Sequence, residues 1–162
     1  MYVPYNQLPD NARVWIYQSN RKFTPEEELQ ISELTTSFVE QWTRHGENVK
    51  GSFVIKYHQF LIIAVDQDFV EVSGCSIDAS VKLVQQIQNL FKLDMLNKLT
   101  IAYKTKDDLQ IVSMADFTQM AKNQTIDKQT VVFNNMVNTK KGIEEQWEVA
   151  AKDSWHARFF NA

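Results

Sequence analysis

The chain of 162 residues contains little cysteine, glycine or proline. Its single cysteine, Cys75, excludes an intramolecular disulfide and a cysteine-rich zinc site. Four glycines and three prolines are too few for a long flexible linker or a low-complexity tail. With 44% hydrophobic and 23% charged residues, the composition is that of a globular protein with its own core. We therefore predict a single domain over 1–162, with its core at about 12–105 and a C-terminal elaboration at about 106–162.

An excess of positive charge and a long apolar run are also missing. The formal net charge is −3, whereas a general nucleic-acid binder carries a basic excess, so nucleic acid is not an expected partner. The longest apolar run, 60–65, is far shorter than the roughly 20 residues that cross a bilayer as a helix. Residues 1–6 have neither the positive charge nor the apolar stretch of a signal peptide. We expect a cytoplasmic protein that contacts no membrane, and no residue pattern indicates a cofactor.

The spacing of apolar residues predicts an alternation of strands and helices. Strands are predicted over 12–17, 52–57, 60–66 and 98–104, and helices over 25–44 and from Ser76 or Asp78 to about residue 93. This β-α-β-β-α-β order is typical of the ferredoxin-like fold, an α+β fold in which right-handed crossovers place both helices on one sheet face. The C-terminal extension is predicted to add a strand or hairpin and a short helix. The alternative is another α+β arrangement of the same elements.

Two local features are the most informative for the fold. Thr24, Pro25 and Glu27 predict a helix start, because Thr24 can cap the helix, Pro25 suits its first position and Glu27 completes a capping box. The strand at 60–66 is almost entirely apolar, which predicts a central strand buried on both faces. A tight connection around His58 joins it to the preceding strand, although this turn lacks the Gly or Asn that tight hairpins prefer.

Parts of the sequence are similar to ATPase motifs but lack the residues that bind nucleotide. Gly46 and Gly51 have the spacing of a P-loop, yet Ser52 and Phe53 follow where the P-loop needs Lys and then Ser or Thr. The loop also follows a predicted helix and precedes a strand, so no helix N-terminus would face the phosphates. We therefore expect no ATPase activity.

RNA recognition motifs share the predicted order of strands and helices. Trp15 and Tyr17 alternate along the first strand and so share a face on which bases could stack. However, Ser52 and Val54 stand where the longer signature of the motif has stacking aromatics. The acidic balance of the chain also opposes phosphate contacts, which leaves single-stranded RNA binding as a minor alternative.

Three short segments are distinctive as a set. They are 13–18, 74–78 and 152–156, with the sequences Arg-Val-Trp-Ile-Tyr-Gln, Gly-Cys-Ser-Ile-Asp and Lys-Asp-Ser-Trp-His. Together they resemble a family of short, uncharacterised bacterial proteins whose members are often labelled ABC transporter ATPase. The resemblance spans the whole chain but implies no known activity, substrate or catalytic residue. The ATPase label conflicts with the missing nucleotide motifs.

Cys75 is the candidate nucleophile. It follows Gly74 at a predicted helix N-terminus, where backbone N–H groups and the helix dipole favour a thiolate. His156 could fold back and act as its base. Alternatively, the Gly74-Cys75-Ser76 turn binds an anion through its backbone amides. The remaining interpretation, which we favour, is a small residue buried in a tight turn, since free cysteine is among the most buried residue types.

Carboxylates on either side of this turn form a candidate metal site. Asp66 and Asp78, together with Asp68 and Glu71, stand at a strand end and at the start of the following helix, where they could hold magnesium. The alternative is that Asp66 and Asp68 belong to a solvated turn and that Asp78 caps the helix.

The end of the chain is unusually aromatic. Four large aromatic residues fall within 147–160, namely Trp147, Trp155, Phe159 and Phe160. They are expected either to dock on the open face of the sheet or to form the surface of a homodimer or of a complex with a protein partner. We favour docking on the chain's own sheet.

No catalytic set is complete in this sequence. We therefore predict a binding or protein-interaction module without ATPase activity. The alternative is a small enzyme or an anion- or metal-binding protein with its site at the Gly74-Cys75-Ser76 turn and the nearby carboxylates.

Overall fold

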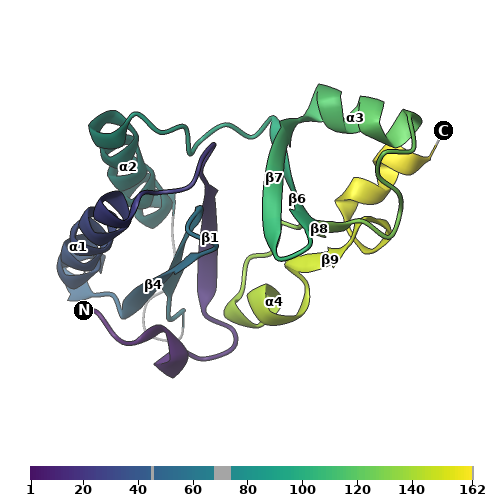
Figure 1. Cartoon of the computed structure of the whole chain (residues 1–162). Coiled ribbons are helices and arrows are strands. Elements are labelled where there is room, and N and C mark those ends of the chain that lie inside the picture. Colours follow the sequence, from purple (N-terminus) through teal and green to yellow (C-terminus); the bar gives the residue numbers. More distant parts are fainter. Residues whose placement is uncertain (45, 68–73, 162) are drawn as a thin grey trace. The chain divides into compact units, whose positions relative to one another are not determined.

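The computed structural model describes residues 1–44, 46–67 and 74–161, and of residues 44 and 74–77 the backbone alone (Figure 1). The chain folds into two compact units. Unit 1 comprises Met1–Leu96 and Asn138–Lys141, and unit 2 comprises Asn97–Val137 and Gly142–Ala162. That the chain forms a single domain with a core at 12–105 stays a prediction.

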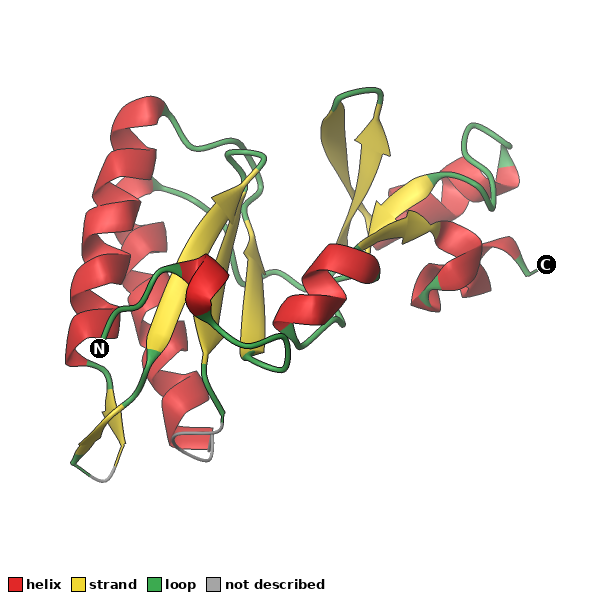
Figure 2. Cartoon of the chain, turned by 90° about the horizontal axis from the view of Figure 1, so that it is seen from below, coloured by secondary structure: helices red, strands yellow, loops and turns green. Residues whose placement is uncertain are grey.

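Unit 1 consists of an antiparallel sheet with two helices on one face. Its strands are β1 (Arg13–Gln18), β4 (Gly51–Lys56) and β5 (Phe60–Val65), in the order β1-β5-β4. The helices α1 (Pro25–Gln41) and α2 (Gly74–Phe91) pack against each other on the same face of this sheet (Figures 1 and 2). Three smaller elements complete the unit, namely the 3-10 helix η1 (Tyr5–Gln7) and the short paired strands β2 (Thr43–Arg44) and β3 (Glu47–Asn48).

The α+β class is confirmed, but the sheet differs from the ferredoxin-like prediction. The predicted fourth strand forms as β6 (Thr100–Thr105), yet it pairs within a second sheet in unit 2. The outer edge of β1 instead meets the segment 138–140. Val14 N donates to Asn138 O at 3.0 Å, and Lys140 N donates to Ala12 O at 2.9 Å. The β-α-β-β-α order is therefore observed in unit 1, while the neighbour of β1 comes from much later in the chain.

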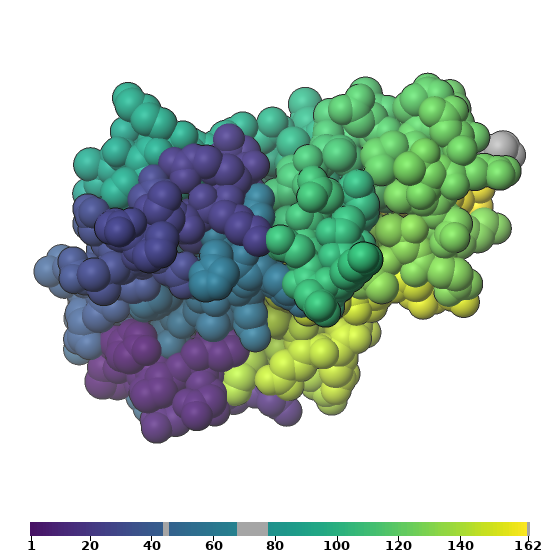
Figure 3. All heavy atoms as spheres, in the orientation of Figure 1, coloured from purple at the N-terminus to yellow at the C-terminus, as the bar shows by residue number. Residues whose placement is uncertain are grey.

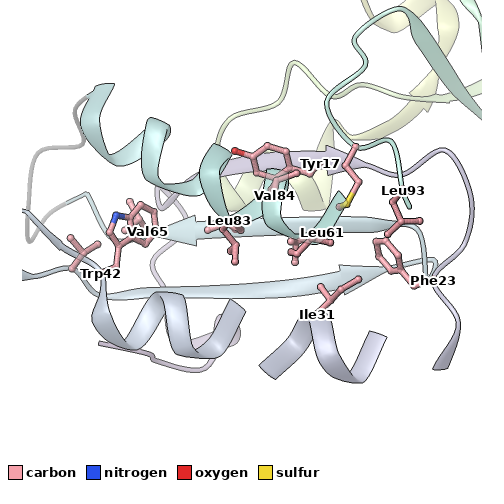
Figure 4. Packing of buried hydrophobic residues seen from close by; sticks show 13 residues of the cluster. Tyr17, Phe23, Ile31, Trp42, Leu61, Val65, Leu83, Val84 and Leu93 are labelled. Carbon is pink, nitrogen blue, oxygen red and sulfur yellow. The ribbon is translucent and has the colours of Figure 1, made fainter. Parts of the chain in front are cut away.

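The core of unit 1 lies between the sheet and its two helices. All six residues of β5 are buried, and the strand lies between β1 and β4, as its apolar sequence predicts. Leu61 and Val65 of β5 belong to one apolar cluster with Ile31 of α1 and Val84 of α2 (Figure 4). Burying an aliphatic side chain of this size stabilises the fold by about 1.5–3 kcal/mol, so this cluster fixes both helices on the sheet.

Unit 2 is built on a four-stranded antiparallel sheet. Its strands are β6, β7 (Asp108–Ser113), β8 (Val131–Phe133) and β9 (Glu148–Ala150), in the order β7-β6-β8-β9. The remaining elements of the C-terminal part are α3 (Met114–Lys122), α4 (Lys140–Glu145), η2 (Ala151–Asp153) and η3 (Trp155–Phe160). The strand and short helix predicted for the extension correspond to β7 and α3. No helix in the described parts of the chain is long and apolar enough to cross a membrane.

The C-terminal aromatic residues pack within unit 2. Trp147 is buried, its ring centroid lies 5.0 Å from that of Phe133, and its Nε1 donates to Asn135 Oδ1 at 2.9 Å. Trp155, Phe159 and Phe160 are half-buried against a cluster centred on Phe117. These residues therefore pack on their own chain within unit 2. Docking on the open face of the predicted ferredoxin-like sheet, and the alternative of a homodimer or partner surface, stay predictions.

A buried lysine, Lys140, fixes the segment 138–141 to the N-terminal part of unit 1. The side chain of Lys140 is almost inaccessible, and its Nζ donates to Leu8 O at 2.7 Å and to Asn6 O at 3.4 Å. The same ammonium lies 5.6 Å from the ring centroid of Tyr5. One side chain thus ties residues 138–141 to the loop that precedes β1.

Replacing Lys140 by methionine is expected to lower the free energy of unfolding by about 2 kcal/mol, since the buried Leu8 carbonyl loses its charged donor. Urea unfolding followed by circular dichroism would measure this loss. The control is Lys141→Met, because Lys141 is exposed and its substitution should change stability by less than about 0.5 kcal/mol. Equal losses in the two variants would contradict the role of the Lys140 side chain.

Candidate functional site

The structure places the Gly74-Cys75-Ser76 segment in the first turn of α2. The helix begins at Gly74, earlier than predicted, so neither Ser76 nor Asp78 is its cap residue. The side chains of Cys75 and Ser76 lie outside the described residues, and the nucleophile and anion hypotheses for this segment stay predictions.

The two candidate metal ligands lie apart from any cluster of ligands in the described residues. Asp66 follows β5, is half-buried, and its backbone N donates to Lys50 O at 2.9 Å. Asp78 is exposed on α2, whereas Asp68 and Glu71 lie outside the described residues. No group of three or more His, Cys, Asp or Glu side chains in the described ranges could hold a metal ion. The metal hypothesis stays a prediction.

His156 lies in unit 2, whereas Cys75 belongs to unit 1. Its imidazole is buried and stacks on Trp155 with 3.9 Å between ring centroids, and its Nδ1 lies 2.7 Å from Ser154 Oγ. Burial lowers the pKa of His156 to about 4, and the nearby positive charge of Arg158 lowers it further in the same direction. These are the surroundings of a neutral core histidine, and its predicted role as a base for Cys75 stays a prediction.

Unit 1 contains a surface hollow that the sequence did not predict. The hollow has a volume of about 620 Å³, is open to solvent and lies beside the N-terminal end of α1. The surface that lines the hollow is mainly apolar and includes a few charged side chains. The residues that line it are Lys22, Phe23, Pro25, Glu28, Leu29, Ser32 and His58. We call it the α1 hollow.

One wall of the α1 hollow is the start of α1. The predicted capping box is confirmed, because Thr24 Oγ1 accepts from Glu27 N at 3.1 Å and Glu27 Oε1 accepts from Thr24 N at 2.9 Å. Arg21 donates to both carboxylate oxygens of Glu27, at 2.8 and 2.9 Å. This guanidinium lowers the pKa of the Glu27 carboxyl to about 2. Arg21 also donates to Phe91 O at 2.9 Å, so the loop before α1 is held to the end of α2.

The opposite wall is the turn between β4 and β5. Tyr57 and His58 have φ angles of 55° and 54°, a left-handed conformation that non-glycine residues rarely adopt in succession. Gln59 N donates to Lys56 O at 3.0 Å and closes the turn. Such strain persists only where surrounding contacts hold the backbone in place.

Hydrogen bonds from the loop between β1 and α1 supply those contacts. Phe23 N donates to His58 O at 2.7 Å, and Ser19 N donates to Gln59 O at 2.8 Å. In return, Gln59 Nε2 donates to Ser19 O at 3.1 Å. The loop that precedes α1 and the turn that carries His58, both of which contribute to the lining of the α1 hollow, are therefore joined by hydrogen bonds.

The side chains at the rim combine a paired imidazole with an exposed apolar group. His58 Nδ1 lies 2.7 Å from Glu28 Oε2, which orients the imidazole over the α1 hollow. Leu29, one residue further along α1, is 63% exposed. Pro25, which is exposed, adds to the apolar surface of the hollow, whereas Phe23, which also lines it, is largely buried.

Comparison with known proteins does not add to this picture: no family model, no curated protein and no solved structure matches the chain. The chemical capacity of the site therefore follows from its own geometry. An open, mainly apolar hollow can accept a protruding apolar side chain, and the polar atoms at its rim can orient the backbone that carries it.

Proposed function

We propose that this chain is a protein-interaction module without ATPase activity and that the α1 hollow is its binding surface. The observation that carries this proposal is an exposed Leu29 that lines a hollow in which Phe23 and His58 are joined by a backbone hydrogen bond. A preformed surface needs little ordering when a partner binds, so more of the contact energy remains as affinity.

The shape of the α1 hollow supports binding of a protein surface over small-molecule catalysis. Sites for small molecules enclose most of their ligand, whereas this hollow is open to solvent. Apolar contacts at the centre with polar groups around them are the usual anatomy of a protein interface. The lining of the α1 hollow combines both kinds of group, since Pro25 and Leu29 are apolar and Lys22 and the Glu28–His58 pair are polar or charged.

The test places a photo-reactive benzoylphenylalanine at position 29 and, as a control, at position 90. Leu90 is also exposed, at 56%, and lies on α2 of the same unit. We expect a discrete cross-linked partner from position 29 and none from position 90. The partner is then purified, and its affinity for the Leu29→Asp variant is expected to fall by about tenfold or more, as for a central interface residue, with Leu90→Asp unchanged. Identical adducts at both positions, or an unchanged affinity of Leu29→Asp, would overturn the proposal.

A further inference from the structure

We infer that the partner bound at the α1 hollow is a positively charged protein segment that presents an apolar anchor side chain flanked by lysine or arginine. This inference rests on the proposed function of the hollow and specifies its partner by charge. It follows from the distribution of carboxylates along α1, of which only some are neutralised within the chain.

All charged residues of helix α1 are negative. Its sequence, PEEELQISELTTSFVEQ, contains five glutamates and no lysine or arginine. Glu27 pairs with Arg21 and Glu28 pairs with His58. The other glutamates of α1 are exposed and make no ion pair within the described part of the chain. They are Glu26, Glu33 and Glu40.

The uncompensated carboxylates lie in line with the exposed leucine. Residues three and four apart on a helix are neighbours on one face, so Glu26, Leu29 and Glu33 follow one another along the surface of α1. In the space-filling view α1, in dark blue, lies at the surface of unit 1 (Figure 3). Glu26 and Glu33 do not line the α1 hollow themselves, but a partner that contacts Leu29 meets one of these carboxylates on either side of Leu29 along the helix. Lys22 lines the hollow and contributes one positive charge there.

Charge complementarity selects the partner from the possible occupants. A cationic segment gains attraction from both carboxylates, whereas an anionic one is repelled. A second copy that docked α1 against α1 through a two-fold axis would bring the same glutamates together. Nucleic acids and anionic lipid surfaces are negatively charged and are repelled in the same way. A basic protein segment is the occupant that matches the exposed Leu29 and the two carboxylates that flank it, Glu26 and Glu33. These two carboxylates outnumber the single lysine, Lys22, that lines the hollow.

The probe is a fluorescent peptide with a central Leu-Phe pair flanked by lysines, compared with its twin in which every lysine is glutamate. Binding to the full chain is measured by fluorescence anisotropy and by ¹⁵N chemical-shift perturbation. We expect the lysine peptide to bind, to perturb residues of α1 and of the turn at His58, and to bind more weakly at high salt because these charges are exposed. The glutamate peptide is expected not to bind.

Two double variants separate a local from a general charge effect. Glu26→Lys with Glu33→Lys is expected to weaken binding of the lysine peptide by about tenfold. Glu144→Lys with Glu145→Lys makes the same change in net charge at exposed positions of α4 and is expected to leave affinity within about twofold.

The outcomes distinguish this inference from the proposed function. Equal binding of the two peptides, no binding of either, or equal effects of the two double variants would overturn the basic partner. The photo-cross-link from position 29 would then still support an interaction surface of different chemistry. If position 29 gives no specific cross-link and Leu29→Asp does not weaken peptide binding, the surface itself is wrong.

Discussion

Replacing Phe117 by alanine is expected to lower the free energy of unfolding by about 3–5 kcal/mol, because the substitution removes an entire buried aromatic ring. Phe117 is completely buried on α3. Its ring centroid lies 5.2 Å from that of Phe159, 6.1 Å from that of Phe160 and 6.3 Å from that of Tyr103. Deleting this ring removes a partner from each neighbour and leaves a cavity in the middle of unit 2, since rigid surroundings collapse only partly.

Urea unfolding of Phe117→Ala, followed by circular dichroism and by tryptophan fluorescence, measures this loss. Phe159→Ala is the matched control, because Phe159 belongs to the same cluster but is only half-buried. Its loss is expected to be clearly smaller. If the two substitutions cost the same, Phe117 is not the centre of this cluster and the docking of η3 on α3 is in question.

Stability is expected to fall by roughly 3 kcal/mol as the pH is lowered from about 7.5 to about 4, because of His156. Burial lowers the pKa of this imidazole to about 4, whereas an unfolded histidine has a pKa near 6.5. Between these values the unfolded chain binds a proton that the native chain does not bind. The stabilisation is therefore fully present above pH 6.5 and is lost as the pH falls toward 4.

The midpoint of urea unfolding, measured across this pH range, tests the expectation, together with an NMR titration of the imidazole. The Arg21–Glu27 pair affects only the lower end of this range, because the pKa of Glu27 is lowered from 4.5 to about 2 and its stabilisation is lost as the pH falls from near 4.5 toward 2. His156→Asn is expected to flatten the dependence, whereas His58→Gln, at an exposed site, should leave the slope assigned to His156. A slope that survives in His156→Asn would show that another group causes it.

Local sequence features predicted the elements of this fold better than their pairing. Thr24, Pro25 and Glu27 fix the start of α1 through contacts within one helical turn, and these are readable from the sequence. The apolar run at 60–65 likewise predicts a buried central strand. Alternation identifies 100–105 as a strand but does not reveal its neighbour, because any half-buried strand has the same pattern. β6 and β7 form a local hairpin, in which Thr105 pairs with Asp108. The pairing of β6 with β8, through Tyr103 and Val132, instead depends on a contact between residues that lie far apart in the sequence.

Sequence motifs did not reveal the candidate site either, because its residues lie far apart in the sequence. Glu28 and His58 are 30 residues apart and meet only because the turn between β4 and β5 packs on the start of α1. One signal was present, namely a tight turn without the Gly or Asn that such turns prefer. A residue held in a strained conformation is a better pointer to this site than any spacing of chemical groups. Sequence reasoning instead singled out Cys75 and Asp66. Both were chosen for the chemistry of their side chains and not for a strained backbone conformation.

The segment 138–141 determines when unit 1 can be completed during synthesis. Its hydrogen bonds to Val14 and Ala12, and those of Lys140 to the loop before β1, use residues that are translated after most of unit 2. A nascent chain that ends at Leu96 has every strand of the first sheet but not the segment at its β1 edge. Neither unit is continuous in the chain, so no single cut in the gene separates them. Unit 1 reaches its final form only after residue 141 has emerged from the ribosome. Until then, the β1 edge and the loop before it lack the contacts that this segment supplies.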